Sequence, residues 1–248
     1  MIKGIDLSEW NENVNYEGLK ASGIEFAILR IGYGKDKYDS DGRLQKDAMF
    51  DTHYAGCKRA GIKVGAYHYS YCTTEKNAIK EAENCLRFLD GVELDLPVFY
   101  DLENKTILNN NVDVEEIAID FCNRIFADGY DAGVYASLNW FNNYLDVNKL
   151  KSFGIYIYLA QWNDTMDADF PVDIWQNTNH NEFGYDGDIL INESLLDIPT
   201  IDANVYQSLA VDVIYGRYGN GDERKQALGE YYDRVQDIVN DMYEIIGG

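Results

Sequence analysis

The order of apolar and amphipathic segments constrains the fold of this chain more than any other feature. Eight short segments have β-strand patterns, at residues 4–8, 26–34, 63–71, 96–103, 131–137, 156–162, 172–178 and 188–192. Most of them are continuously apolar, as expected of strands that are covered on both faces. Helical patterns separate the earlier segments, and this alternation predicts parallel strands that are joined by right-handed crossovers.

The helical patterns are predicted at residues 15–23, 46–60, 74–89 and 112–129. Glycines end the first two, Thr74 can cap the third, and the fourth is amphipathic. Less helix separates the later strands, so we predict an α/β fold, an irregular TIM-like β/α barrel with fewer helices in its second half. An open doubly wound sheet is the alternative, although no GxGxxG motif follows the first strand.

The character of the chain changes after Leu196. Residues 1–196 are predicted to form the catalytic β/α barrel, and residues 197–204 a short linker. Helical patterns at residues 205–216, 219–229 and 231–245 predict that residues 205–248 form a small all-α module of three helices.

Charge excludes some classes of partner. The chain has 43 acidic and 21 basic residues, for a net charge of −22. This argues against nucleic acid or an anionic membrane surface as the main partner. The sequence has no long apolar segment for membrane insertion, and its start, MIKGIDLSEW, has no signal-peptide core. We therefore expect synthesis in the cytoplasm without a signal peptide.

Polar and aromatic residues occupy the ends of the predicted strands, where function gathers in a barrel of parallel strands. These residues are Asp6, Tyr33, His68, Tyr69, Asp101, Glu103, Tyr135, Gln161, Trp162, Trp175, Gln176, Asp186 and Asp188. Rings stack on the faces of sugars, and carboxylates and amides bind their hydroxyl groups. The composition of this end of the barrel therefore suits a carbohydrate ligand.

Two carboxylates follow the fourth apolar segment, in the stretch LPVFYDLEN. Asp101 and Glu103 are two residues apart, so they share one face of the strand, roughly 6.5–7 Å apart along the backbone. Their charges repel, with Asp6 and Asp186 adding to the field, so one acid should hold its proton near neutral pH. Glycosidic cleavage needs such an acid beside an ionised one. An ordinary charged strand end is the alternative, since acid-x-acid pairs are common in so acidic a chain.

Other readings remain open for several of these residues. Trp162 and Trp175 are either walls of a groove or barrel filling, and His68 either lines the site or is a buried core histidine. The chain has only three histidines, His53, His68 and His180, and their spacing is not that of a zinc site. We therefore predict no metal and no cofactor.

Six motifs in order resemble glycoside hydrolase family 25, the N-acetylmuramidases of bacteria and their phages. They are GIDLSEW, RIGYG, AGIKVGAYHYSY, PVFYDLE, GVYAS and DIWQ, within residues 2–196. The resemblance implies a barrel with irregular later strands. It also implies retaining cleavage of the β-1,4 bond between N-acetylmuramic acid and N-acetylglucosamine in peptidoglycan.

The resemblance also implies roles for single residues. Glu103 would be the general acid/base, and Asp101 would orient the substrate's own acetamide group as it attacks the anomeric carbon. Asp6 matches the family's acid on the first strand. In GYDGDILIN the position of a further family acid is held by Leu190, so either Asp186 or Asp188 serves as the fourth acid. The substrate-binding residues would be Tyr33, Tyr67, His68, Tyr69, Tyr135, Gln161, Trp162, Trp175, Gln176 and Asp188.

The tail resembles one cell-wall-binding repeat of the CW-seven class, over residues 216–228 and 231–240. The resemblance implies a muropeptide-binding surface made of Tyr218, Gly219, Asn220, Gly221 and Arg224. The alternative is that these residues only shape the turn and cap the next helix. A homodimer through this module is a further possibility.

These observations predict a lysozyme, an endolysin that acts on the bacterial wall after its release from the cytoplasm. A chitinase-like glycosidase, a non-catalytic wall-binding protein and a zinc amidase are the alternatives.

Overall fold

The computed structural model describes residues 2–110, 112–196, 209–210, 213–214, 217–232, 235–236 and 238–240. The chain divides into two compact units. The first consists of residues 1–126 and 131–198, and the second of residues 127–130 and 199–248. The predicted linker, residues 197–204, lies outside the described residues.

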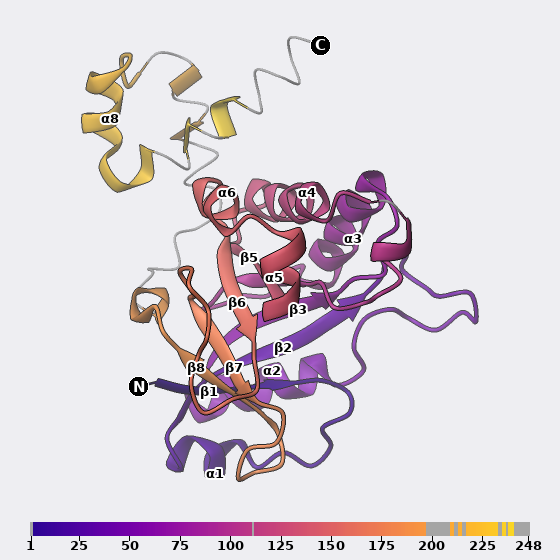
Figure 1. Ribbon diagram of the computed structural model, residues 1–248. Coiled ribbons are helices and arrows are strands. Elements are labelled where there is room, and N and C mark those ends of the chain that lie inside the picture. The colour runs from indigo at the N-terminus through magenta and orange to yellow at the C-terminus, as the bar shows by residue number, and fades with distance from the viewer. Residues whose placement is uncertain are drawn as a thin grey trace. The chain divides into compact units, whose positions relative to one another are not determined.

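Eight strands close into a barrel in the order in which they occur in the sequence (Figure 1). They are β1 (Ile2–Leu7), β2 (Ile24–Tyr33), β3 (Lys63–Tyr69), β4 (Val98–Asp101), β5 (Ala132–Ser137), β6 (Tyr156–Ala160), β7 (Ile174–Thr178) and β8 (Asp186–Leu190). The predicted barrel is confirmed, and the open doubly wound sheet is excluded.

The helices are concentrated in the first half of the barrel. The helices of this unit are α1 (Tyr16–Ala21), α2 (Phe50–Ala60), α3 (Glu75–Phe88), α4 (Val114–Ala127), α5 (Leu138–Tyr144) and α6 (Val147–Ser152), of which the last two follow β5. Two 3-10 turns, at Leu108–Asn110 and Glu193–Leu196, complete this unit. The described residues between β6 and β8 contain no helix, which confirms the reduced second half.

Local signals set several helix ends. The side chain of Thr74 caps α3 by accepting from the Asn77 amide, and Gly61 ends α2 in a left-handed conformation with φ of 71°. The prediction that α2 begins near residue 46 is wrong. Residues before Phe50 pair with β2 instead: Lys46 forms an antiparallel bridge with Gly32, and the Asp47 amide donates to the Ile31 carbonyl.

The direction of β8 differs from the prediction that all eight strands are parallel. β8 is antiparallel to both of its neighbours, β7 and β1. The short loop between β7 and β8 contains no helix, so no crossover is made and the chain turns straight back. The first residues of β8 therefore lie at the same end of the barrel as the last residues of β1.

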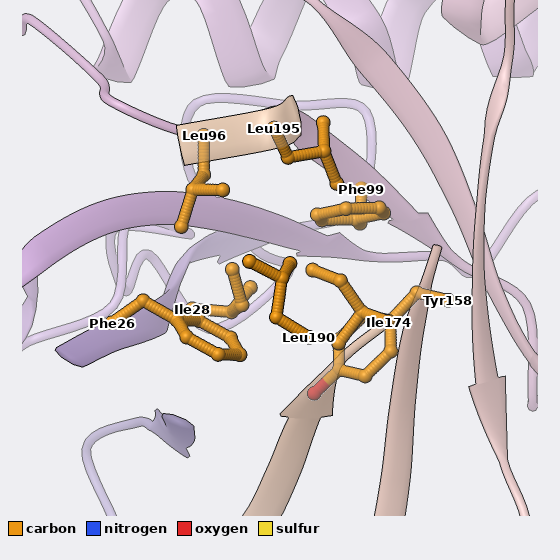
Figure 2. Close-up of a cluster of buried hydrophobic side chains, with 8 residues drawn as sticks. All are labelled: Phe26, Ile28, Leu96, Phe99, Tyr158, Ile174, Leu190 and Leu195. Carbon is orange, nitrogen blue, oxygen red and sulfur yellow. The ribbon is translucent and has the colours of Figure 1, made fainter. Parts of the chain in front are cut away.

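An apolar cluster inside the barrel draws its side chains from five strands, β2, β4, β6, β7 and β8, and from two flanking segments (Figure 2). It consists of Phe26, Ile28, Leu96, Phe99, Tyr158, Ile174, Leu190 and Leu195. Gly4 makes room for it, because a Cβ at this position would lie 2.3 Å from the ring of Phe26. The Tyr158 ring belongs to this cluster, and its hydroxyl group is the only polar side-chain group drawn there.

The second unit is described in part. It contains α8 (Asp222–Leu228) and a 3-10 turn at Gly229–Tyr231. Its buried residues are Ala210, Val213, Leu228, Val235 and Val239. The middle predicted helix corresponds to α8, whereas the predictions for residues 205–216 and 231–245 fall partly outside the described residues. Across the described part of the chain, we find no helix with the length and apolarity to cross a membrane.

The inward face of β8 can be tested with a pair of neighbouring residues. Leu190 is 2% exposed and Ile191 is 44% exposed. We expect Leu190→Ala to lower the free energy of unfolding by about 2–5 kcal/mol, because it opens a cavity in the barrel. Ile191→Ala should change it by no more than about 0.5 kcal/mol. Urea unfolding of both variants checks this, and equal losses would contradict the assigned face.

Candidate active site

A cleft of about 420 Å³ opens at the mouth of the barrel, where the parallel strands end. Its lining residues are Asp6, Ser8, Trp10, Asn11, Arg30, Tyr67, Tyr69, Asp101, Glu103, Tyr135, Tyr158, Gln176, Gly184, Tyr185 and Asp186. Four of them are acids, and five are tyrosines.

The four acids reach the cleft from distant parts of the chain. Asp6 lies near the end of β1, Asp101 ends β4, and Glu103 follows two residues later. Asp186 begins β8 and pairs with Asp6 in the antiparallel ladder. The antiparallel direction of β8 therefore explains how an acid at the start of a strand joins acids at the ends of others.

Burial raises the pKa values of all four acids, and the charges of neighbouring acids raise those of Asp6, Asp101 and Glu103 further. Burial and the nearby Asp186 raise the pKa of Asp6 from 3.8 to about 7. Burial, with the charges of Glu103 and Asp6, holds the pKa of Asp101 well above its ordinary value. Burial and Asp186 raise the pKa of Glu103, and burial raises that of Asp186. The cleft thus favours carboxyl groups that keep their protons to a higher pH than usual.

Gln176 connects the rim of the cleft to Asp6. Its Nε2 donates to Asp6 Oδ2 at 2.7 Å, and its Oε1 accepts from the Tyr135 hydroxyl at 3.0 Å. Trp162 Nε1 donates to the same Oε1 at 2.8 Å. The two donors orient the amide so that its nitrogen faces Asp6. Trp162 itself is 59% exposed and lies outside the residues that line the cleft.

Arg30 is a cleft residue that the sequence analysis missed, and it is the only base among the lining residues. Its Nε donates to Asp47 Oδ2 at 2.7 Å, and it also binds Glu9. Asp47 Oδ2 accepts from the Glu9 amide at 2.9 Å as well. This ion-pair cluster holds the loop that carries Trp10, whose side chain is 79% exposed beside the cleft.

Other lining residues were also missed, among them Ser8, Trp10, Asn11, Tyr158 and Tyr185. A charged residue inside the apolar run FAILRIGYG was a signal for Arg30, because a buried charge needs partners or a function. Trp10 lies in the quoted motif GIDLSEW, directly after the first strand.

Several predicted substrate-binding residues lie elsewhere. His68 is fully buried, packs on Phe121 of α4 and contacts the Gly34 carbonyl through Nε2, so it corresponds to the core alternative. Tyr33 lies against Tyr71, outside the cleft lining.

Trp175 and Gln161 are joined by a hydrogen bond. Trp175 is 7% exposed, and its Nε1 donates to the Gln161 carbonyl at 2.8 Å. The Gln161 side chain binds Asp167. Strand alternation places Trp175 on the outer face of β7, opposite Ile174 and Gln176, so it is a buried packing residue and neither fills the barrel interior nor forms a wall of the groove.

The structure separates the two acids of β8. Asp186 lines the cleft, whereas Asp188 lies deeper, is 2% exposed and contacts the Tyr158 hydroxyl at 2.6 Å. Strand alternation places both on the inner face, one layer apart.

Metal-ligating residues do not gather in the part of the chain that the structure describes, where no group of three or more His, Cys, Asp or Glu could hold an ion. His53 contacts the Tyr16 hydroxyl and the Ser8 carbonyl, and His68 lies against α4. The donor set does not fit a zinc amidase.

Family models match both parts of the chain. Residues 5–185, well over half of the chain, match the model described as glycosyl hydrolases family 25. The chain belongs to glycosyl hydrolases family 25. Residues 207–242 match the model of the CW_7 repeat, which agrees with the resemblance of the tail.

Individual relatives of this family 25 chain support the fold. The autolytic lysozyme of Clostridium acetobutylicum is 26% identical over 146 residues, which cover 58% of this chain and 41% of the relative. The catalytic domain of endolysin ply40, from bacteriophage P40 of Listeria monocytogenes, superposes with a TM-score of 0.64 at 22% identity, over 79% of this chain and 96% of that one. A family GH25 lysozyme from Aspergillus fumigatus gives 0.61 at 24% identity, over 76% and 93%. The chain thus spans about two fifths of the curated relative's length.

The second candidate site surrounds Arg224 in the described part of the CW_7 repeat. Its guanidinium donates to the Gly219 carbonyl at 3.1 and 3.2 Å and to Asn220 Oδ1 at 3.1 Å. It also donates to Gln236 Oε1 at 2.8 Å. Arg224 therefore joins the Gly219–Gly221 turn to a later segment of the repeat.

The raised pKa of Asp6 makes stability depend on pH. Between 3.8 and about 7 the folded state binds this proton and the unfolded state releases it, so stability falls as pH rises through this window. We expect Asp6→Asn to be more stable than the parent by about 1–3 kcal/mol at pH 7 to 8 and equal to it near pH 4. Urea unfolding across this range is the measurement. The control is Asp41→Asn, at a side chain that is 75% exposed. It should leave the pH dependence of the free energy of unfolding as it is in the parent.

Proposed function

We propose that the chain is an N-acetylmuramidase, a lysozyme that hydrolyses the β-1,4 bond between N-acetylmuramic acid and N-acetylglucosamine. The observation that carries this proposal is the convergence of Asp6, Asp101, Glu103 and Asp186 on one cleft of a family 25 barrel. The names of the curated relatives, which are lysozymes, support the same activity.

Glu103 is the general acid/base of this proposal. Burial and Asp186 raise its pKa, so it can hold the proton that the leaving oxygen needs and later accept one from water. It is more open to solvent than Asp101, which is 4% exposed, so it is the acid that a glycosidic oxygen can reach.

Asp101 is assigned to the substrate's acetamide group. Its Oδ1 has no hydrogen-bond partner among the described residues, although it is buried and lies in the cleft wall. An acetamide N–H that donates to this oxygen would satisfy it and would orient the acetamide oxygen toward the anomeric carbon. The configuration is then retained without a protein nucleophile, which is the substrate-assisted exception among retaining glycosidases.

Glycan binding fits the walls of the cleft. Trp10, Tyr69 and Tyr185 offer ring faces, and Gln176 and Asn11 offer amide groups. We propose Trp162, Tyr67 and Tyr135 as further contacts near the rim and floor. Peptidoglycan strands are the proposed partner, and we assign the CW_7 repeat to hold the enzyme on the wall, which raises its effective concentration there.

The biological role that we propose is that of an endolysin. Similar solved structures include the catalytic domain of a phage endolysin, and the CW_7 repeat supports a site of action on the wall. A chitinase-like activity and a binding protein without activity are the alternatives that the experiment must separate.

The decisive experiment is a digest of purified bacterial sacculi. We expect borohydride reduction and mass spectrometry of the products to show new muramitol ends. Glu103→Gln should lower their yield by about 10²-fold or more, because it removes the group that transfers protons. Glu116→Gln, at an exposed position of α4, is the matched control and should retain the parent rate.

Each other outcome has a defined meaning. Glucosaminitol ends would place cleavage at the opposite bond, and activity on soluble chitin oligomers would favour the chitinase-like alternative. Tight binding to sacculi without new reducing ends would show that the chain is a wall-binding protein without lysozyme activity.

The wall-binding role can be tested separately at Arg224. We expect Arg224→Ala to weaken binding to sacculi by about tenfold, through loss of charge-assisted hydrogen bonds. Lys225→Ala removes the same charge from the next residue of α8 and should bind as the parent does. Cosedimentation measures binding, and thermal unfolding is its control. A loss of stability without a loss of affinity would assign Arg224 to the turn alone.

A further inference from the structure

Asp188 is a buried acid beneath the cleft to which the proposed reaction gives no role. It lies on the inner face of β8, opposite Gly4 of β1 and Gln176 of β7. The Tyr158 hydroxyl lies between it and the cleft, 2.6 Å from Asp188 Oδ1 and 3.4 Å from Asp6 Oδ2. One phenol group thus bridges a deep carboxyl group and a cleft carboxyl group.

The bridge through Tyr158 depends on where its protons lie. Two oxygen–oxygen contacts on Tyr158 need two protons if both are to be attractive. The phenol supplies one, since burial raises the pKa of Tyr158 well above its ordinary value. The second proton must then reside on one of the two carboxyl groups.

The surroundings of the two acids decide which one holds that proton. Asp6 Oδ2 accepts a hydrogen bond from Gln176 Nε2 at 2.7 Å, which favours a carboxylate. Asp188 Oδ2 is buried and has no hydrogen-bond partner among the described residues. An ionised Asp188 would leave a charged oxygen unsolvated, whereas a neutral carboxyl group leaves only a weak acceptor.

The charges that face Asp188 act in the same direction. Asp6 on β1 and Asp186 on its own strand are both acidic, Tyr158 on β6 is a neutral phenol, and Gln176 on β7 carries no charge. Burial is the larger cause, and together they hold the pKa of Asp188 well above its ordinary value. Among the residues that the structure describes, none of the groups that act on it is a cation.

We propose that Asp188 is a positioning residue that works in its neutral form: its carboxyl proton is donated to the Tyr158 oxygen, which turns the phenol proton toward Asp6. The proposal rests on the lysozyme activity proposed above. Above its pKa of about 7, Asp6 then carries a negative charge in the cleft without facing a second charge across one hydroxyl group. A stable anion at this place favours the positive charge that develops on the sugar ring during glycosidic cleavage.

Two substitutions separate a neutral donor from a charge. Asp188→Asn keeps the shape and an N–H donor toward Tyr158, whereas Asp188→Leu removes the donor. With sacculi as substrate, we expect Asp188→Leu to lower kcat by about tenfold with little change in KM, because one buried hydrogen bond is lost. Asp188→Asn should restore most of kcat.

The pH profile provides a readout that a structural role alone would not move. In the parent, deprotonation of Asp188 should contribute to the fall of activity at alkaline pH. Asp188→Asn has no proton to lose there, so its alkaline limb should move to higher pH. In a Tyr158→Phe background the bridge is absent, and the same substitution should no longer shift the limb.

Two kinetic results would contradict a neutral, positioning Asp188. An Asp188→Asn enzyme as slow as Asp188→Leu, or one with an unmoved alkaline limb, would overturn the proposal. A parent protein that releases no reducing ends would instead refute the lysozyme activity.

If the parent is inactive, or if Asp188→Leu does not fold, thermal unfolding of Asp188→Asn still tests the protonation state of Asp188. A neutral Asp188 predicts that Asp188→Asn melts at or above the parent's temperature at pH 8 and loses this advantage near pH 4. A lower melting temperature at pH 8 would show that Asp188 is ionised and would overturn the proposal.

Discussion

Backbone hydrogen bonds from β8 to both β1 and β7 close the barrel, and they are antiparallel on both sides. This pairing brings the start of β8 to the mouth, so Asp186 lies opposite Asp6 in the ladder. A parallel β8 would place the same residue at the far end of the barrel, away from Asp101 and Glu103. The arrangement of the acid cluster therefore depends on the direction of one strand.

The barrel interior is divided into an apolar floor and an acidic mouth. Each fully buried aliphatic or aromatic side chain of the floor contributes about 1.5–3 kcal/mol to folding. The mouth costs free energy, because burial and repulsion raise the pKa values of Asp6, Asp101 and Glu103. The floor offsets this cost, and the raised pKa values are what acid catalysis requires. The residues that stabilise the barrel and the acids proposed for catalysis thus lie in different layers of its interior.

The sequence predicted the residues that line the cleft better than it predicted which face of each strand they occupy. The run KVGAYHYSY suggested Tyr67, His68 and Tyr69 together, but strand alternation sends Tyr67 and Tyr69 into the cleft and His68 toward α4. Both faces of this strand are covered, so its apolar and aromatic pattern did not reveal which face was inside. Arg30 was missed for a different reason. Its ion-pair partners Asp47 and Glu9 come from separate loops, so the sequence around Arg30 does not show them.

The sequence by itself determined the β/α barrel, its reduced second half, the position of the Asp101–Glu103 pair at a strand end and the family motifs. These features are local: they depend on periodicity, on capping residues such as Thr74 and on short ordered motifs. Only the tertiary structure decided that β8 runs antiparallel, that Asp186 reaches the cleft while Asp188 lies beneath it, and that Gln176 and Tyr158 contact Asp6. These features depend on register and on contacts between residues more than 150 positions apart in the chain, which no local pattern encodes.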